Sequence, residues 1–166
     1  MKVDDFCRTF GVECIYHFTD EANLPSIRLR GLVPYRFLKD RPHWGPVRPG
    51  GSKSSHVQDS RSGFDRYVHL CFTMDHPMSH QALKEGRITS LVWVEVSCEV
   101  LHRKGVLGCK TLANTNGAEV VPIEQALDMI DLPTLFGAEC PVSVRKAQIL
   151  VPGSIPVSKL RVVGHG

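Results

Sequence analysis

The hydrophobic residues of this chain fall into short runs that are separated by polar, proline-rich and glycine-rich segments. Runs rich in β-branched or aromatic residues predict strands at 15–19, 67–73, 89–97, 145–151 and 159–163. Because strands and helices do not alternate in regular β-α-β units, the pattern favours an α+β fold with a largely antiparallel core.

Helical signals lie between some of these runs. One helix is predicted from Asn23, a residue type suited to the N-cap, to the terminating Gly31. A second is predicted from Asp75 as N-cap to Lys84, with a proline in its first turn, and a third over 123–130.

Residues 33–66 contain four prolines and several glycines, and this composition predicts a long loop without regular structure. Tyr35 and Trp44 lie within it, among basic residues. That mixture favours a lid over an anionic ligand, or a strip that binds nucleic acid through stacking and phosphate contacts, over a plain surface linker.

Length and composition indicate a single globular domain over 1–166. The chain is 42% hydrophobic and 22% charged, as in ordinary globular proteins. No apolar run approaches the roughly 20 residues that cross a bilayer, and the N-terminus has no signal-peptide pattern. The six cysteines form no C-x-x-C pair and several lie in apolar runs, which is typical of reduced core cysteines. We therefore expect a cytoplasmic protein.

The net charge of +3 conceals two oppositely charged segments. From Arg28 to Arg66 there are nine basic and three acidic residues, a balance of +6. From Thr111 to Val144 there are five acidic residues and no Lys or Arg, a balance of −5. The basic segment either faces a polyanion or attracts the acidic one across a cleft, and the sequence leaves both alternatives open.

Most catalytic and metal-binding motifs are missing. His76 and His80 have the i, i+4 spacing of metal ligands, but no cysteine or carboxylate joins them at a recognised spacing, so we expect no metal site. There is no glycine-rich dinucleotide motif and no P-loop. His17 and Thr19 at the end of the first strand could hold a nucleotide, although these residues alone favour a structural role.

The ordered set of segments, taken together, resembles the DarT-type DNA ADP-ribosyltransferase toxins over about residues 13–163. The matching segments are Tyr16-His17-Phe18-Thr19, Asn23-Leu24 with Ile27 and Gly31-Leu32, Val57-Gln58-Asp59-Ser60-Arg61, Val68-His69-Leu70-Cys71-Phe72 with Pro77-Met78, and Ala147-Gln148-Ile149-Leu150-Val151. The resemblance implies an ADP-ribosyltransferase-like core of antiparallel strands with short helices and a long loop that covers NAD.

The resemblance also implies the site. NAD, as co-substrate, would be bound by His17, Phe18, Thr19, Asn23, Leu32, Lys53 and Phe72. Arg61, or else Lys53, would meet the pyrophosphate or activate the target base. The acceptor would be a base in single-stranded DNA, or alternatively in RNA, bound by Arg48, Lys53, Asn114 and Asn116 within and beside a recognition loop over 114–144. An antitoxin protein would be the partner, in a toxin–antitoxin or phage-defence system.

One departure from the family concerns catalysis. The family's catalytic glutamate corresponds to Gln148, whose amide can bind a ribose hydroxyl but cannot accept a proton. Either a deliberate glutamate-to-glutamine change silences a toxin, or the natural protein uses another carboxylate, with Glu119 leading and Glu124 next. We favour the silenced toxin. The alternatives are an inactive nucleotide-binding or nucleic-acid-binding module, and a transferase that acts on RNA or protein.

Overall fold

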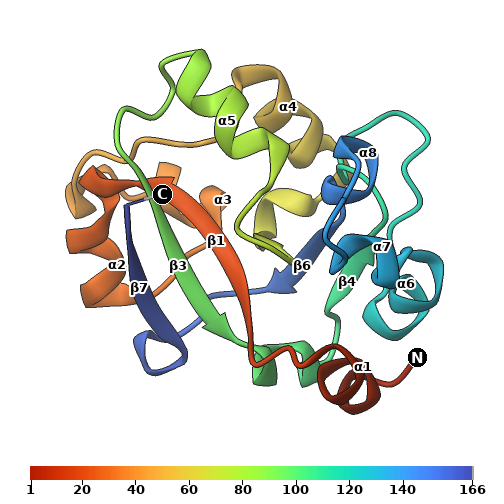
Figure 1. The fold of residues 1–166 in the computed structure, drawn as a ribbon. Coiled ribbons are helices and arrows are strands. Elements are labelled where there is room, and N and C mark those ends of the chain that lie inside the picture. The colour runs from red at the N-terminus through yellow and green to blue at the C-terminus, as the bar shows by residue number, and fades with distance from the viewer. Residues whose placement is uncertain (166) are drawn as a thin grey trace.

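The computed structural model describes residues 1–165, and its centre is a seven-stranded antiparallel sheet (Figure 1). In chain order the strands are β1 (Cys14–Asp20), β2 (Tyr67–Cys71), β3 (Leu91–Ser97), β4 (Leu107–Cys109), β5 (Val121–Pro122), β6 (Gln148–Pro152) and β7 (Leu160–His165). Across the sheet the order is β5-β4-β6-β2-β1-β3-β7. The α+β fold with an antiparallel core, predicted from the hydrophobic pattern, is confirmed.

The sheet is nearly divided between β1 and β2. β1 pairs with β3 along its whole length, whereas its pairing with β2 consists of Tyr16 opposite Cys71. Beyond that pair the two halves of the sheet diverge (Figure 1). Backbone groups that a continuous ladder would satisfy must find other partners there, and the site described below lies at this division.

Short helices surround the sheet. They are α1 (Val3–Phe10), α2 (Leu24–Arg30), α3 (Tyr35–Lys39), α4 (Lys53–Ser62), α5 (Pro77–Lys84), α6 (Ile123–Met129), α7 (Leu132–Leu135) and α8 (Val142–Arg145), with 3-10 turns η1 (Glu21–Asn23), η2 (Pro42–Trp44), η3 (Phe64–Arg66), η4 (Cys98–His102) and η5 (Val157–Lys159). None of the helices within residues 1–165 is long and apolar enough to cross a membrane.

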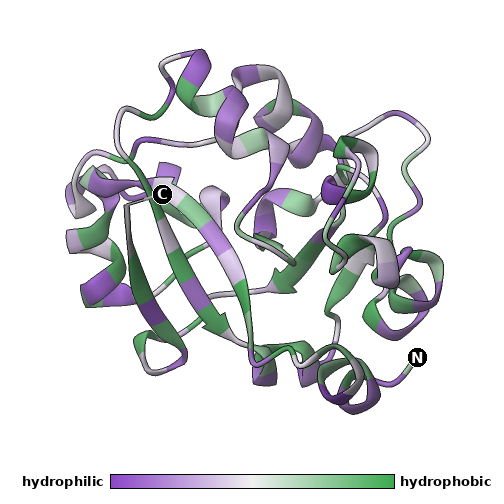
Figure 2. Ribbon diagram, in the orientation of Figure 1, coloured by the Kyte–Doolittle hydropathy of each residue, from purple (hydrophilic) through white to green (hydrophobic). Residues whose placement is uncertain are grey.

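The core lies on both faces of the sheet. Along β3, Val92, Val94 and Val96 pack into the larger hydrophobic cluster, while Leu91 and Trp93 pack into a smaller one. This alternation follows from the period of two in a strand, which sends successive side chains to opposite faces. Figure 2 shows green along much of the strands and a mixture of purple and green along the surrounding helices.

The predicted absence of regular structure over 33–66 is wrong, because residues 53–62 form α4. The Ser55 amide donates to the Ser52 hydroxyl at 3.1 Å, which caps the helix, and Gly63 ends it in the left-handed conformation with φ 75°. α4 carries no apolar stripe, and its only buried residue is Asp59. Hydrophobic periodicity therefore could not reveal it.

The predicted N-caps are also corrected. Asp20, not Asn23, caps the turn before α2, because the Ala22 amide donates to its carboxylate at 2.9 Å. In α5 the Met78 amide donates to the Nδ1 atom of His76, and Asp75 instead pairs with Arg145 and His80. In both cases a neighbouring side chain has the geometry to cap, which leaves the predicted residue to other partners.

Candidate active site at the division of the sheet

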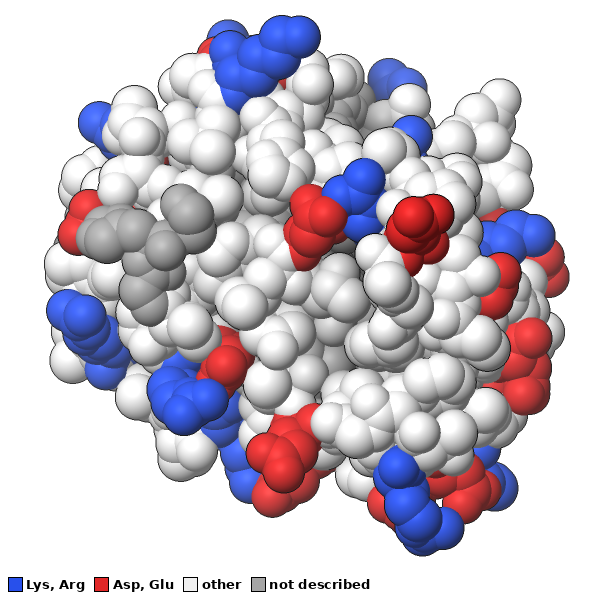
Figure 3. All heavy atoms as spheres, viewed as in Figure 1, with Lys and Arg blue, Asp and Glu red and all other residues white. Residues whose placement is uncertain are grey.

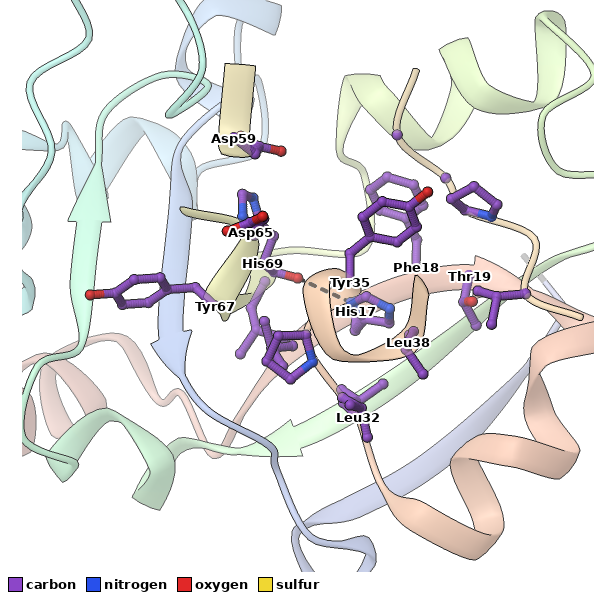
Figure 4. Close-up of a pocket in the computed structure, with 18 of the residues that line it drawn as sticks. His17, Phe18, Thr19, Leu32, Tyr35, Leu38, Asp59, Asp65, Tyr67 and His69 are labelled. Carbon is purple, nitrogen blue, oxygen red and sulfur yellow. Dashed lines mark hydrogen bonds between the residues drawn. The ribbon is translucent and has the colours of Figure 1, made fainter. Parts of the chain in front are cut away.

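A cavity of about 220 Å³ opens where β1 and β2 diverge (Figure 4). Its walls come from the end of β1, the start of α3, residues 47–51, α4, β2 and the start of β6. Of the residues predicted from the resemblance, the cavity is lined by His17, Phe18, Thr19, Asn23, Leu32, Arg48, Asn114 and Gln148. Residues from both halves of the chain therefore meet in one place.

His17 spans the division of the sheet. Its Nδ1 atom lies 3.0 Å from the backbone oxygen of His69 (Figure 4). Because a carbonyl oxygen only accepts hydrogen bonds, Nδ1 carries the proton and Nε2 remains an acceptor. Burial lowers the pKa of His17, more than the bond to His69 raises it. The ring is therefore a neutral hydrogen-bonding group at the cavity wall.

Asn23 ties the segment 45–51 to the end of β1. Its Nδ2 atom donates to the Thr19 hydroxyl at 2.9 Å and to the Arg48 carbonyl at 2.8 Å, while its Oδ1 atom accepts from the Arg48 amide at 2.9 Å. The Arg48 guanidinium donates to Thr89 Oγ1 at 2.8 Å and lies 3.9 Å from the Asp20 carboxylate. A cation is thus held at the rim beside two strand-end residues.

Acidic and imidazole groups line the α4 side of the cavity. His56 stacks on Tyr35 with ring centroids 3.9 Å apart, and Asp59 extends from α4 above Asp65 and His69 in Figure 4. Burial raises the pKa of Asp59, although His69 and His56 act against this rise. Among the described residues, His56 Nε2, Asp59 Oδ1 and Asp65 Oδ1 are buried without a hydrogen-bond partner. Such orphaned atoms fit a polar ligand.

Gln148 begins β6, opposite Cys71 on one side and Cys109 on the other. Its Oε1 atom accepts a hydrogen bond from the Ala113 amide at 3.0 Å. Gln148 therefore both lines the cavity and anchors the segment over 112–114. With Oε1 engaged by a donor, the amide offers its NH₂ group for further bonds, where a glutamate would offer a second acceptor oxygen.

The structure leaves several predicted residues outside the cavity. Arg61 is exposed on α4, and two residues along a helix turn the side chain by about 200°, so it faces away from Asp59. Lys53 is exposed at the start of α4, and Glu119 is exposed beyond the wall. Phe72 is 2% exposed in the core, edge-on to Phe6. We leave these four residues out of the site.

The remaining predicted residue, Asn116, lies in a shallower polar depression beside the cavity. That depression lies between α4 and the turn-rich segment 113–120, and its lining includes Gln58, Phe64 and Asn114. Asn114 lines both hollows. The two hollows therefore meet at the segment that Gln148 anchors.

Sequence reasoning missed the residues of α4 that line the cavity, Ser55, His56 and Asp59. Their spacing of one, three and four residues places them on one helical face. That signal was available, but it becomes visible only once residues 53–62 are recognised as a helix.

Charged residues on the face in Figure 3 alternate in sign around a largely uncharged centre. No continuous basic patch is visible on this face. Within residues 1–165 there is also no group of three or more His, Cys, Asp or Glu side chains arranged to hold a metal ion.

The antiparallel sheet and its surrounding helices match solved structures of ADP-ribosyltransferases, and comparison with known protein families specifies the family. Residues 16–165 match the family model described as "ssDNA thymidine ADP-ribosyltransferase, DarT". The chain therefore belongs to the DarT family. No curated protein sequence matches it significantly.

Solved structures of DarT proteins share the fold. Thermosipho africanus DarTG in complex with ADP-ribose superposes with a TM-score of 0.69 at 16% identity, over 90% of this chain and 43% of that one. Thermus sp. 2.9 DarT in complex with ADP-ribosylated ssDNA gives 0.62 at 19% identity, over 87% and 77%. The same Thermus protein in complex with NAD+ gives 0.60 at 17% identity, over 90% and 80%. The chain thus spans less than half of the Thermosipho protein.

Proposed function

We propose that this chain transfers ADP-ribose from NAD to the base of thymidine in single-stranded DNA and releases nicotinamide. The observation that carries the proposal is the meeting of His17, Thr19, Asn23 and Gln148 around one cavity in a member of the DarT family. Support for the two substrates comes from the related structures, which contain NAD+ and ADP-ribosylated ssDNA.

In this proposal NAD lies along the cavity from β1 to the rim. His17 and Thr19 bind the ribose next to nicotinamide and the carboxamide, since both offer hydrogen bonds without a fixed negative charge. Leu32 and Phe18 supply apolar lining. We assign the pyrophosphate to Arg48 in place of Arg61, because its guanidinium is held at the rim and two phosphates call for a cation there.

The acceptor base enters from the depression beside the cavity. Its lining of amides and hydroxyls with Phe64 offers hydrogen bonds and an aromatic surface to an unpaired base. Gln58, Asn114 and Asn116 carry the amides. RNA is the alternative acceptor, and a substrate that differs only in its 2′-hydroxyls distinguishes the two.

Gln148 makes the reaction slow. The glycosidic bond of NAD breaks through an oxocarbenium-like state, and a carboxylate beside the ribose stabilises its positive charge. An amide supplies no such charge, and loss of one preorganised group of this kind costs about 10² to 10³ in rate. Incubation with labelled NAD and a thymidine-containing oligonucleotide, followed by mass spectrometry, tests the proposal.

A second candidate function is a nucleotide-binding module without catalysis, and the observation that favours it is Gln148 itself. The Gln148→Glu variant distinguishes the transferase from the binding module. A transferase gains activity on the oligonucleotide, whereas a binding module retains NAD binding and releases no nicotinamide.

We also propose that the chain is the cytoplasmic toxin of a toxin–antitoxin or phage-defence system, with a protein antitoxin as partner. Membership of the DarT family supports the proposed toxin role. Expression of the Gln148→Glu variant should arrest growth, and co-expression of the antitoxin should restore it. Equal growth with both forms of the chain would count against the toxin role.

A further inference from the structure

Gln148 has no carboxylate. Among the described residues, the carboxylates that line the cavity are Asp59 and Asp65. Asp65 accepts a hydrogen bond from the Ser60 hydroxyl at 2.7 Å, and Arg36 and Lys39 each lie 3.9 Å from its Oδ2 atom. The two cations balance the charge of Asp65. This carboxylate therefore has a structural role beneath α3 and α4.

Asp59 has different surroundings. It is 9% exposed, and its Oδ1 atom, like that of Asp65, is buried without a hydrogen-bond partner, so the two carboxylates differ in the cations near them. The charged or titratable groups around it are His56 one turn earlier on α4, His69 on β2 and Asp65 on η3, while the Asn114 side chain lies within hydrogen-bonding reach. No Lys or Arg pairs with it among the described residues. A buried, unpaired carboxylate of this kind needs a ligand or a function.

Asp59 lies close to the depression from which the acceptor base is proposed to enter the cavity. Asn114, its neighbour, lines both the cavity and the adjoining depression. Asp59 therefore lies on the side where an incoming base would meet the ribose, while Gln148 holds the same segment from β6 through the Ala113 amide. Asp59 and Gln148 therefore contact the same short segment, Asp59 beside Asn114 and Gln148 at the Ala113 amide.

We infer that Asp59 is the general base of the reaction and removes the N3 proton of thymine. This inference rests on the proposed function. The C1′–N bond of NAD breaks and its electron pair leaves with neutral nicotinamide, N3 bonds to C1′, and the N3 proton passes to the Asp59 carboxylate and then to solvent. N3 is the attacking atom because N1 of thymine already carries the deoxyribose.

Two physical features suit Asp59 to this task. Burial raises its pKa above that of an ordinary aspartate, which makes it a stronger base near neutral pH. Glu119 and Glu124, the substitutes considered from sequence, lack such a position: Glu119 is exposed outside the cavity, and Glu124 pairs with Lys2 at 3.1 Å.

The test compares Asp59→Asn with Asp59→Glu and with a matched control, Glu13→Gln, which changes an exposed carboxylate just before β1. Each variant is made in the chain that carries Gln148 and together with Gln148→Glu. Three quantities are measured: NAD affinity, the rate of thymidine modification against pH, and the same rate on an oligonucleotide with 5-bromodeoxyuridine, whose N3 proton is more acidic.

If Asp59 is the base, Asp59→Asn lowers the rate by about 10² to 10⁴ at unchanged NAD affinity. Bromodeoxyuridine recovers part of the loss, Asp59→Glu recovers part of it on thymidine, and the control keeps the full rate. Retained NAD affinity shows that the variant is folded. An Asp59→Asn variant with the parent rate and pH profile, or an equal loss on both bases, overturns the inference while the function stands. Absence of modification by every form, Gln148→Glu included, overturns the proposed function and the inference with it.

Discussion

Individual side chains decide what the cavity can do, and Asn23 is the clearest example. It satisfies two backbone groups of Arg48 and the hydroxyl of Thr19, all in a site where Asn23 itself is 8% exposed. A buried donor or acceptor that loses its hydrogen-bond partner lowers the free energy of unfolding by about 1 to 3 kcal/mol. We expect Asn23→Ala to lower the free energy of unfolding by about that amount, as urea titration would measure.

The same substitution should weaken NAD binding, because the segment that carries Arg48 loses its attachment to β1. Asn116→Ala is a suitable stability control, since Asn116 is exposed. Equal stability and equal NAD affinity in Asn23→Ala and the parent chain would show that the 45–51 segment is held by other contacts.

Gln148 is the second residue whose chemistry can be separated from its structural role. A glutamate at this position can still accept the Ala113 amide, because its carboxylate oxygen replaces Oε1. We therefore expect Gln148→Glu to raise the rate of nicotinamide release about 10² to 10³ while the thermal midpoint changes little. Gln148→Ala separates the two roles: it should lower the thermal midpoint without raising the rate.

At the scale of elements, the end of α2 depends on one glycine. Gly31 has φ +78°, and a Cβ atom built on it would lie 2.0 Å from the backbone oxygen of Ile155. The next residue, Leu32, exchanges backbone hydrogen bonds with Ile155 at 3.0 and 2.8 Å. Backbone cannot move aside as a flexible side chain can.

We therefore expect Gly31→Ala to destabilise the protein by more than about 1 kcal/mol, since both its φ and its surroundings exclude a methyl group. Gly117→Ala is the matched control: it has φ +76° but no atom within 4 Å of the added Cβ, so it isolates the cost of φ alone. Equal losses in the two variants would show that the Ile155 contact contributes nothing.

The elements also show how far sequence reasoning reaches. Strands with an apolar run, such as β3, and helices with ordinary start and stop signals, such as α2, were predicted from local pattern. α4 was missed because its buried face is polar, and it carries Asp59. The roles of His17 and Gln148 followed only from the family resemblance. Phe72 lies in the core and Arg61 lies outside the cavity, because a motif does not say which face of an element its residues occupy.

At the scale of the whole molecule, histidines with lowered pKa values link folding to pH. Burial lowers the pKa of His17, His56 and His76 below 6.5, in the case of His76 to about 4. At a pH between the pKa of such a histidine in the folded chain and 6.5, its pKa in the unfolded chain, the unfolded chain binds a proton that the folded chain does not. Stability is therefore full above pH 6.5 and falls as pH falls, by up to about 3 kcal/mol for His76 below pH 4.

The variant His76→Asn tests this linkage, because asparagine can still accept the Met78 amide at the start of α5. We expect the slope of unfolding free energy against pH to shrink between pH 6.5 and 4. His43→Gln, which changes an exposed histidine, should leave the slope unchanged. An unchanged slope in His76→Asn would mean that His76 has the same pKa in the folded and unfolded chains.

The prediction of one domain over 1–166 concerns the same scale and remains a prediction. The divided sheet is the main feature that the whole molecule adds to the sequence. It brings the end of β1, the polar face of α4 and the start of β6 around one cavity. The proposed reaction depends on this convergence and not on any single motif.

The most direct test of the account is mass spectrometry of a thymidine-containing single-stranded oligonucleotide after incubation with NAD and the Gln148→Glu variant. We predict the added mass of one ADP-ribose on a thymidine base, equimolar release of nicotinamide, and a slower reaction of the same kind with the chain that carries Gln148. An unmodified oligonucleotide with intact NAD, from a variant that is folded and binds NAD, would contradict the account.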